Sequence, residues 1–231
     1  MLEALRAEVC EANLELVRRG LVLYTFGNAS GISRQDNLVV IKPSGVPYET
    51  MTPADMVITD LEGRAVEGNL RPSTDLATHL ALYRAFPSIG GIAHTHSRHA
   101  TAWAQACWEI PCFGTTHADY FHGPVPVTSP LAPLEIESDY EANTGLAIIR
   151  AMEGRDALAC PAVLVAGHAP FCWGKSVTDA THAAVIVEEL AALAWQTLTI
   201  NPAATPIAET LRDKHHFRKH GPKATYGQGS G

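Results

Sequence analysis

The sequence lacks a hydrophobic run long enough to cross a membrane. A bilayer-spanning helix needs about 20 predominantly apolar residues, and the longest apolar segment, residues 180–200, is interrupted by His182, Glu188, Glu189 and Gln196. The first residues show no apolar signal segment and follow an amphipathic helical pattern instead. These absences predict a cytoplasmic protein without a membrane anchor.

Paired cysteines are also missing. The five cysteines are an odd number, form no Cys-x-x-Cys pair and stand among apolar residues: Cys10, Cys107, Cys112, Cys160 and Cys172. Disulfide frameworks are typical of small secreted domains with even, regularly spaced cysteines. We therefore expect reduced thiols, as in a cytoplasmic protein.

An excess of positive charge is absent as well. The formal net charge is -7, whereas nucleic-acid-binding proteins use a positive field to neutralise phosphates. The one basic cluster, residues 214–223, is short and contains several histidines. We expect no nucleic-acid partner.

Length and patterning indicate one α/β domain. A chain of 231 residues with 46% hydrophobic side chains can bury a substantial core, and no repeat or linker divides it. Apolar spacing predicts helices over residues 2–18, 75–86, 98–107, 138–152 and 178–200, and strands over residues 21–23, 38–41, 56–59, 91–96, 124–133, 162–165 and 171–174. We predict a domain over residues 1–226, in which helices cover a sheet, and a short tail over residues 227–231.

The strongest chemical signal is the triplet His94-Thr95-His96 at the end of a predicted buried strand. Alternate residues of a strand project from the same face, so both imidazoles can converge on one ion while Thr95 points away. An apolar lead-in over residues 90–93 places the pair where an unpartnered polar group is costly. The triplet therefore predicts a metal site.

A catalytic metal site of this type needs a third protein ligand and an open position. His168 is the preferred candidate because small residues flank it in a turn between two predicted strands, although spacing alone leaves His117 and His182 open. Imidazole ligands favour Zn²⁺ over Mg²⁺ or Ca²⁺ and are compatible with Mn²⁺ or Co²⁺.

Several turns carry groups that could bind a phosphate. Such a site needs hydroxyl and backbone N–H donors together with a cation. Lys42 supplies a positive charge, and the turns Gly27-Asn28, Ser44-Gly45 and Ser73-Thr74 supply donors. Each turn by itself is ordinary loop chemistry.

Longer motifs are similar to a known superfamily. Residues 90–101 (GGIAHTHSRHAT) and 114–120 (GTTHADY) resemble the class II aldolases and epimerases and, within them, the ribulose-phosphate 4-epimerases. Shorter matches cover residues 26–28, 41–45, 72–75 and 213–221, so the similarity runs from residue 2 to residue 228. The resemblance implies a three-layer α/β/α domain with a central, mainly antiparallel sheet.

The resemblance also implies the metal site. Its ligands would be His94, His96 and His168, with Asp75 as a further ligand or a close neighbour of the metal. The structural alternative for Asp75 is the N-cap of the following helix. In one departure, Ala166 stands where related epimerases have a second histidine, which argues against a fourth nitrogen ligand.

Substrate contacts and acid/base groups follow from the same resemblance. Asp119 and Tyr226 would serve as acid/base groups on opposite sides of the substrate, with Tyr226 reaching the site of a neighbouring subunit in a homotetramer. The residues that would contact the substrate, mainly its phosphate, are Gly27, Asn28, Ser44, Gly45, Ser73 and Thr74.

The implied reaction interconverts L-ribulose 5-phosphate and D-xylulose 5-phosphate, a step of arabinose or ascorbate use. The C3–C4 bond breaks, the aldehyde rotates, and the bond forms again on the other face. Proton transfer is then needed at both faces, which explains a pair of acid/base groups. The alternatives are a class II aldolase acting on fuculose or rhamnulose phosphate, and a non-catalytic interaction module similar to the adducin head domain.

Overall fold

The computed structural model describes residues 1–220 and residue 224, and its centre is a seven-stranded sheet. The strand order is β4-β3-β2-β1-β5-β7-β6, and each neighbouring pair is antiparallel. The strands are β1 Gly27–Ser33, β2 Leu38–Ile41, β3 Val57–Asp60, β4 Ala65–Glu67, β5 Gly91–Thr95, β6 Ala162–Leu164 and β7 Pro170–Gly174. The helices are α1 Glu3–Arg18, α2 Leu76–Ala85, α3 Arg98–Gln105, α4 Thr115–Ala118, α5 Pro133–Glu137, α6 Tyr140–Ala151, α7 Val177–Ile200 and α8 Glu209–Lys219, with 3-10 turns η1 Tyr48–Thr50 and η2 Pro53–Asp55.

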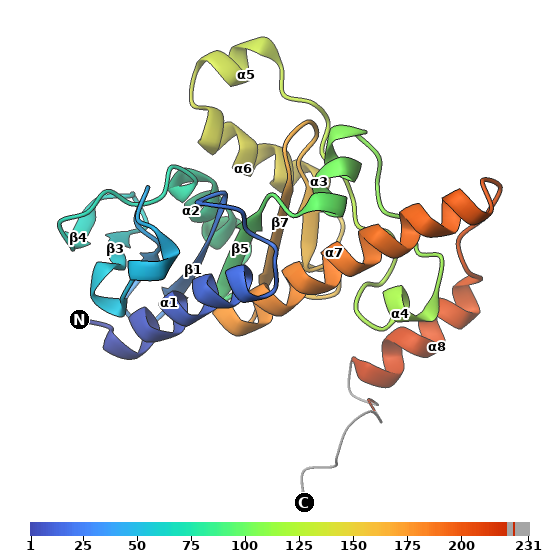
Figure 1. Cartoon of the computed structure of the whole chain (residues 1–231), viewed down its shortest axis with the longest axis horizontal. Helices are drawn as coiled ribbons and strands as arrows, with labels where there is room; N and C mark the ends of the chain where they lie inside the picture. Colours follow the sequence, from blue (N-terminus) through green and yellow to red (C-terminus); the bar gives the residue numbers. More distant parts are fainter. Residues whose placement is uncertain (221–223, 225–231) are drawn as a thin grey trace, which may run out of the picture.

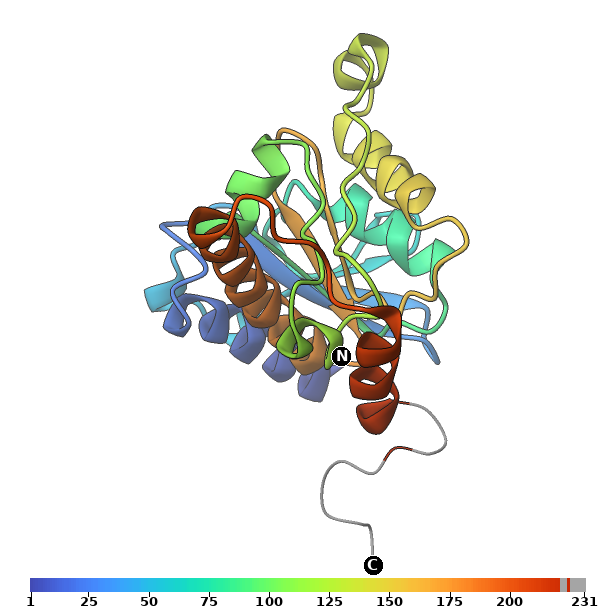
Figure 2. The same cartoon turned by 90° about the vertical axis from the view of Figure 1, so that its right-hand side faces the viewer.

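Helices cover both faces of this sheet (Figures 1 and 2). α1 and α7 lie on one face, while α2, with α6 packed against it, lies on the other. Strand β1 serves both layers because its residues alternate between the faces. Gly31 lies against Val177 and Leu5, whereas the Ser30 hydroxyl bonds to His79 of α2. The predicted three-layer α/β/α arrangement and antiparallel sheet are confirmed.

The central strands approach the first turn of α7 closely. A Cβ atom on Gly91 would lie 2.4 Å from the Cα of Val177, a distance that no side chain tolerates. Glycine at this position therefore lets β5 lie directly under the start of α7. The core fills the space between sheet and helices, and its largest fully buried side chains include Trp173, Phe171 and Tyr83.

Contrary to the prediction from the sequence, helix α7 is long and apolar enough to cross a membrane by length and composition, and it is the one such helix in the described part of the chain. One of its faces packs on β7, β5 and β1, and it also contacts α1 and α3. Buried side chains such as Val187 and Leu190 contribute to the core. Its C-terminal end keeps apolar side chains on the surface, including Trp195 and Ile200.

Most predicted elements are present, but two predicted strands are wrong, and β1, β4, α4, α5 and α8 were not predicted. Residues 21–23 form no strand, because the chain turns there before β1 begins at Gly27. Residues 124–133 make only isolated bridges, between Val125 and Ile110 and between Val127 and Leu164, since their prolines cannot donate to a ladder. Helix α8 occupies a segment that the sequence patterns describe only as a basic cluster.

Candidate metal and substrate site

Three histidines meet where the end of β5 lies beside the start of β7. His94 belongs to β5, His96 follows that strand, and His168 lies in the turn between β6 and β7. Each offers a ring nitrogen, and these three atoms lie within 4.8 Å of one another. The Nε2 atoms of His96 and His168 are 3.2 Å apart. Antiparallel pairing of β5 with β7 thus brings together the side chains that the sequence separates.

The turn that carries His168 is held from both sides. Gly167 has φ of +71°, a left-handed conformation that glycine adopts without a steric penalty. Its N–H donates to the carbonyl of Ala104 at 2.9 Å, and the N–H of His168 donates to the carbonyl of Val165 at 2.9 Å. This backbone bonding points the His168 ring toward the other two.

Hydrogen bonds behind the rings select the nitrogen that faces the cluster. Nδ1 of His94 lies 2.9 Å from the carbonyl oxygen of Pro170. Because a carbonyl only accepts, Nδ1 carries the proton and Nε2 keeps its lone pair. Nδ1 of His168 is 3.3 Å from the hydroxyl of Tyr140, which leaves Nε2 on the side of His96. Such outer partners are typical of metal-binding histidines.

Burial lowers the pKa of two of these rings. Burial, followed by the neighbouring His94 and His96, lowers the pKa of His168 to about 4. Burial and His94 also lower the pKa of His96. Three converging imidazoles fit a divalent transition metal such as Zn²⁺, because that ion prefers nitrogen ligands and three protein ligands leave a position open.

Asp75 lies beside the cluster as an anion. It stands at the N-cap position of α2, but its side chain makes no capping hydrogen bond and instead accepts from Nδ2 of Asn28 at 2.6 Å. Burial raises the pKa of Asp75, but nearby His94 and His79 and the bond from Asn28 outweigh it, so the pKa lies below its ordinary value. Asp75 thus occupies the N-cap position of the structural alternative, but its carboxylate does not cap the helix. In the described chain, the group of atoms within 4.8 Å comprises the three histidines and not Asp75.

A cavity of about 410 Å³ opens at the histidines. Every turn from which the sequence predicts phosphate contacts borders this cavity, so the structure brings the predicted metal and substrate residues together. Its lining comprises Thr25, Phe26, Gly27, Asn28, Lys42, Pro43, Ser44, Gly45, Ser73, Thr74, Asp75, His94, His96, Tyr140, Glu141 and His168.

Lys42 lies beneath one of these turns. Its ammonium donates to the carbonyls of Pro43 and Val46, each at 3.1 Å, and lies 4.6 Å from the centre of the Tyr48 ring. The side chain is 2% exposed, and burial lowers its pKa. Lys42 therefore braces the Ser44-Gly45 turn from behind.

Tyr140 and Glu141, at the start of α6, line the cavity without having been predicted. The Thr78 hydroxyl of α2 donates to the carbonyl of Glu141 at 2.6 Å, which helps to hold α6 against α2. No spacing in the sequence could have indicated these residues, because their place depends on the docking of two helices.

Asp119 does not border the cavity of its own chain. It follows α4, where His215 Nδ1 lies 3.1 Å away and Arg218 donates at 3.0 Å, with Lys219 at 3.4 Å. Burial raises the pKa of Asp119, but bonds from Arg218 and His215 and the charge of Lys219 outweigh it, so the net shift is downward. The carboxylate is ionised. Tyr226 lies outside the described residues.

The other histidines considered as third ligand lie elsewhere. His117 is buried, and its Nε2 donates to the carbonyl of Gly123 at 2.8 Å. His182 lies on α7 next to Tyr120. The geometry thus favours His168.

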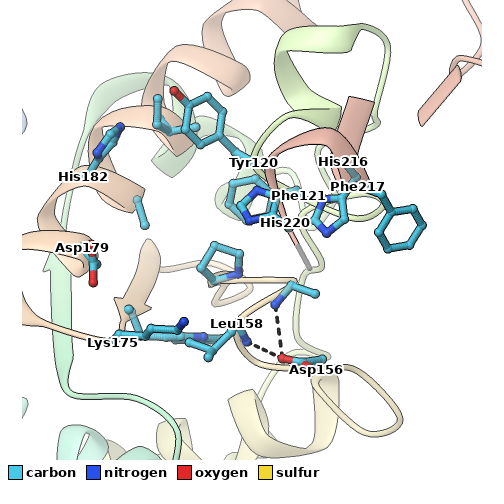
Figure 3. A pocket seen from close by; sticks show the side chains of 16 residues that line it. Tyr120, Phe121, Asp156, Leu158, Lys175, Asp179, His182, His216, Phe217 and His220 are labelled. Carbon is cyan, nitrogen blue, oxygen red and sulfur yellow. Dashed lines mark hydrogen bonds between the residues drawn. The ribbon is translucent and has the colours of Figure 1, made fainter. Parts of the chain in front are cut away.

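A separate cavity of about 500 Å³ lies between α7, α8 and the far end of β7 (Figure 3). His182, His216 and His220 face it. Its two carboxylates are already used, since Asp156 accepts from the backbone of Leu158 at 2.7 Å and Asp179 accepts from a serine hydroxyl at 2.9 Å. Apart from His182, no candidate site residue in the described part of the chain borders this cavity.

Comparisons with known proteins show the family of the chain. Residues 7–195 match the family described as Class II Aldolase and Adducin N-terminal domain. An L-ribulose-5-phosphate 4-epimerase, UlaF, from Salmonella paratyphi B is 54% identical over 227 residues, which cover 98% of this chain and 100% of the relative.

Solved structures extend the similarity to the fold. An L-fuculose 1-phosphate aldolase superposes with a TM-score of 0.78 at 25% identity, covering 92% of this chain and 94% of the other. An L-fuculose-1-phosphate aldolase from Thermus thermophilus has the same fold, with a TM-score of 0.69 at 24% identity over 88% of this chain and 98% of the other. The chain belongs to the class II aldolase family, whose model matches most of its length.

Proposed function

We propose that this protein is a metal-dependent epimerase that interconverts L-ribulose 5-phosphate and D-xylulose 5-phosphate. The observation that carries the proposal is a single cavity that joins three convergent histidines to donor-rich turns. The relative that is 54% identical over nearly the whole chain bears the name of this activity. The reaction would serve arabinose or ascorbate use in the cytoplasm.

Residues at two ends of the cavity would bind different parts of the substrate. The turns at Ser44-Gly45 and Ser73-Thr74 would bind the phosphate through hydroxyl and N–H donors, with the buried charge of Lys42 behind the first turn. His94, His96 and His168 would hold the metal, with Zn²⁺ as the first choice. When bound, a divalent ion supplies Lewis-acid stabilisation of the negative charge that develops as the C3–C4 bond breaks.

Asp119 and Tyr226 would transfer protons on opposite faces of the aldehyde. Because the Asp119 carboxylate lies outside the cavity of its own chain, we propose that it acts in the cavity of a neighbouring subunit of a homotetramer. Apolar side chains at the end of α7 offer a surface for such contacts, since Trp195 is 56% and Ile200 85% exposed.

The test is an assay of L-ribulose 5-phosphate conversion, with a chelator added and Zn²⁺, Mn²⁺ or Co²⁺ then restored. We expect D-xylulose 5-phosphate to form, the activity to disappear with the chelator and to return with one of these metals. Release of a free aldehyde at the turnover rate, without xylulose phosphate, would identify an aldolase instead. Purified protein that binds no transition metal, even after growth with added zinc, would favour an interaction module.

A further inference from the structure

A network of buried polar groups joins α2 to β1 directly behind the candidate metal site. The hydroxyl of Tyr83 lies 2.8 Å from Oγ of Ser30, and the same Oγ lies 2.7 Å from Nδ1 of His79. All three residues have 0% exposure. Buried polar groups are costly unless hydrogen-bonded, and a satisfied network fixes its members in one arrangement.

The spacing of these residues links the polar network to Asp75. Asp75, His79 and Tyr83 follow one another at four-residue intervals, so they lie on one face of α2. Asn28 and Ser30 are alternate residues of β1 and point to the same face of the sheet. Asn28 bonds to Asp75 and Ser30 bonds to His79, which makes two polar contacts between the same helix and strand.

These contacts fix both the rotation of α2 about its axis and its position along β1. The backbone of α2 carries the restraint to the site, because the N–H of His79 donates to the carbonyl of Asp75 at 3.1 Å. The ring of His79 is also packed by the edge of Phe171, which stacks on the metal-site His94. A substitution in this polar network would therefore move Asp75 relative to the metal-site histidines.

Two buried atoms of this layer remain without protein partners. Nε2 of His79 and Oδ1 of Asn28 have no hydrogen bond within the part of the chain that the structure describes. Burial lowers the pKa of His79 to about 3, so the ring is neutral and acts through hydrogen bonds and packing. Neutral polar groups kept at such a cost beside a single carboxylate indicate a role in orienting that carboxylate.

We propose that Tyr83, Ser30 and His79 are positioning residues that hold Asp75 in its place at the metal centre. The inference rests on the proposed metal-dependent function. The network of Tyr83, Ser30 and His79 touches neither the substrate turns nor the three histidine nitrogens that face the cluster. We expect its effect on the metal to pass through Asp75 and not through the packing of His79 on Phe171.

The test measures Co²⁺ and Zn²⁺ affinity of the full-length protein by competition with a chelator, together with the visible absorption of the Co²⁺ form. Ser30→Ala should weaken metal affinity by about tenfold, the lower end of the effect seen for outer partners of metal ligands. It should also shift the Co²⁺ bands. In a background with Asp75→Asn, adding Ser30→Ala should cause no further loss.

Two substitutions of His79 distinguish the roles of its two ring nitrogens. The amide of His79→Asn can take the place of Nδ1 and keep the bond to Ser30, so this variant should retain more affinity than His79→Gln. The matched control is Thr181→Val, which removes another buried hydroxyl, bonded to the carbonyl of Val177 at 3.1 Å, and should leave the affinity unchanged.

The outcomes distinguish this proposal from the function on which it rests. Wild-type protein that binds neither metal would overturn the proposed function itself. Normal metal binding with an unchanged affinity in Ser30→Ala, or additive losses in the double variant, would overturn the positioning role. If Ser30→Ala does not fold, Tyr83→Phe removes only the terminal hydroxyl and supports the same comparison.

Discussion

At the residue scale, Asp119 combines a partly buried carboxylate with cationic neighbours on α8. Its bonds to His215 and Arg218 hold it ionised at the surface of its own chain, as a proton acceptor requires. Asp119→Asn keeps the shape of the side chain and removes the charge. We expect epimerisation to fall by at least about a hundredfold, the usual size of a general acid–base contribution, while metal content measured by elemental analysis stays intact.

A mixing experiment shows whether Asp119 acts in a neighbouring subunit. Asp119→Asn and His168→Ala should each be inactive, and unfolding and refolding them together should restore part of the activity in mixed assemblies. His182→Ala, which changes a histidine outside the site, is the control and should remain active. Wild-type activity of Asp119→Asn would remove this residue from the mechanism, and mixed assemblies without recovery would place it in its own subunit's site.

Residue-scale patterns explain why part of the site was predictable. The alternation of a strand is local, so His94-Thr95-His96 reveals a convergent pair without knowledge of the fold. The third ligand is a different problem, because 72 positions separate His168 from His96. Spacing could not choose it over His117, and the family resemblance supplied the choice.

At the element scale, one carboxylate of α7 fixes the start of α3. Glu188 accepts from the N–H of His99 at 2.9 Å and from the N–H of Ala100 at 3.0 Å, and it also bonds to Nδ1 of His99 at 2.8 Å. The first N–H groups of a helix have no partner within the helix. Glu188 therefore caps α3, which begins two residues after His96.

Glu188→Gln should destabilise the protein, because an amide replaces the charged acceptor of these N–H groups. We expect a loss of about 1–2 kcal/mol in the free energy of unfolding, comparable with the loss of a helix cap, measured by urea denaturation. Its neighbour Glu189 is exposed, so Glu189→Gln is the matched control and should change stability by less than about 0.5 kcal/mol. Equal effects of the two substitutions would contradict the capping role.

Elements with a clear apolar period were predictable, and those without one were not. The predicted range of α7 begins only one residue after the observed one. The agreement is close because a long apolar face of this helix packs on the sheet. Helix α8 has His216 as its only buried residue, so no apolar stripe marks it. It is docked instead by polar contacts to Asp119 and Ala118, which a sequence pattern does not reveal.

At the scale of the whole molecule, buried histidines make the folded state sensitive to acid. The pKa falls to about 3 for His79 and to about 4 for His117, His168 and His216, in each case mainly through burial. The unfolded chain protonates these rings near their ordinary pKa of about 6.5. Between these values the unfolded chain binds more protons than the folded one, so stability falls as the pH falls.

We therefore expect the metal-free protein to hold its full histidine contribution above about pH 6.5 and to lose it progressively down to about pH 4. Urea denaturation of chelator-treated protein at pH values across this window would measure the trend. A free energy of unfolding that stays constant from about pH 7 to about pH 4.5 would show that these rings are not neutral in the folded state.

The sequence by itself determined the His94 and His96 pair, the donor-rich turns and the class of fold, because alternation, turn chemistry and apolar periodicity act over a few residues. Only the tertiary structure decided which residues share a cavity. It placed His168 beside the pair through the pairing of β5 with β7, added Tyr140 through the docking of α6, and left Asp119 outside. These arrangements depend on contacts between distant segments, and no local pattern specifies such contacts.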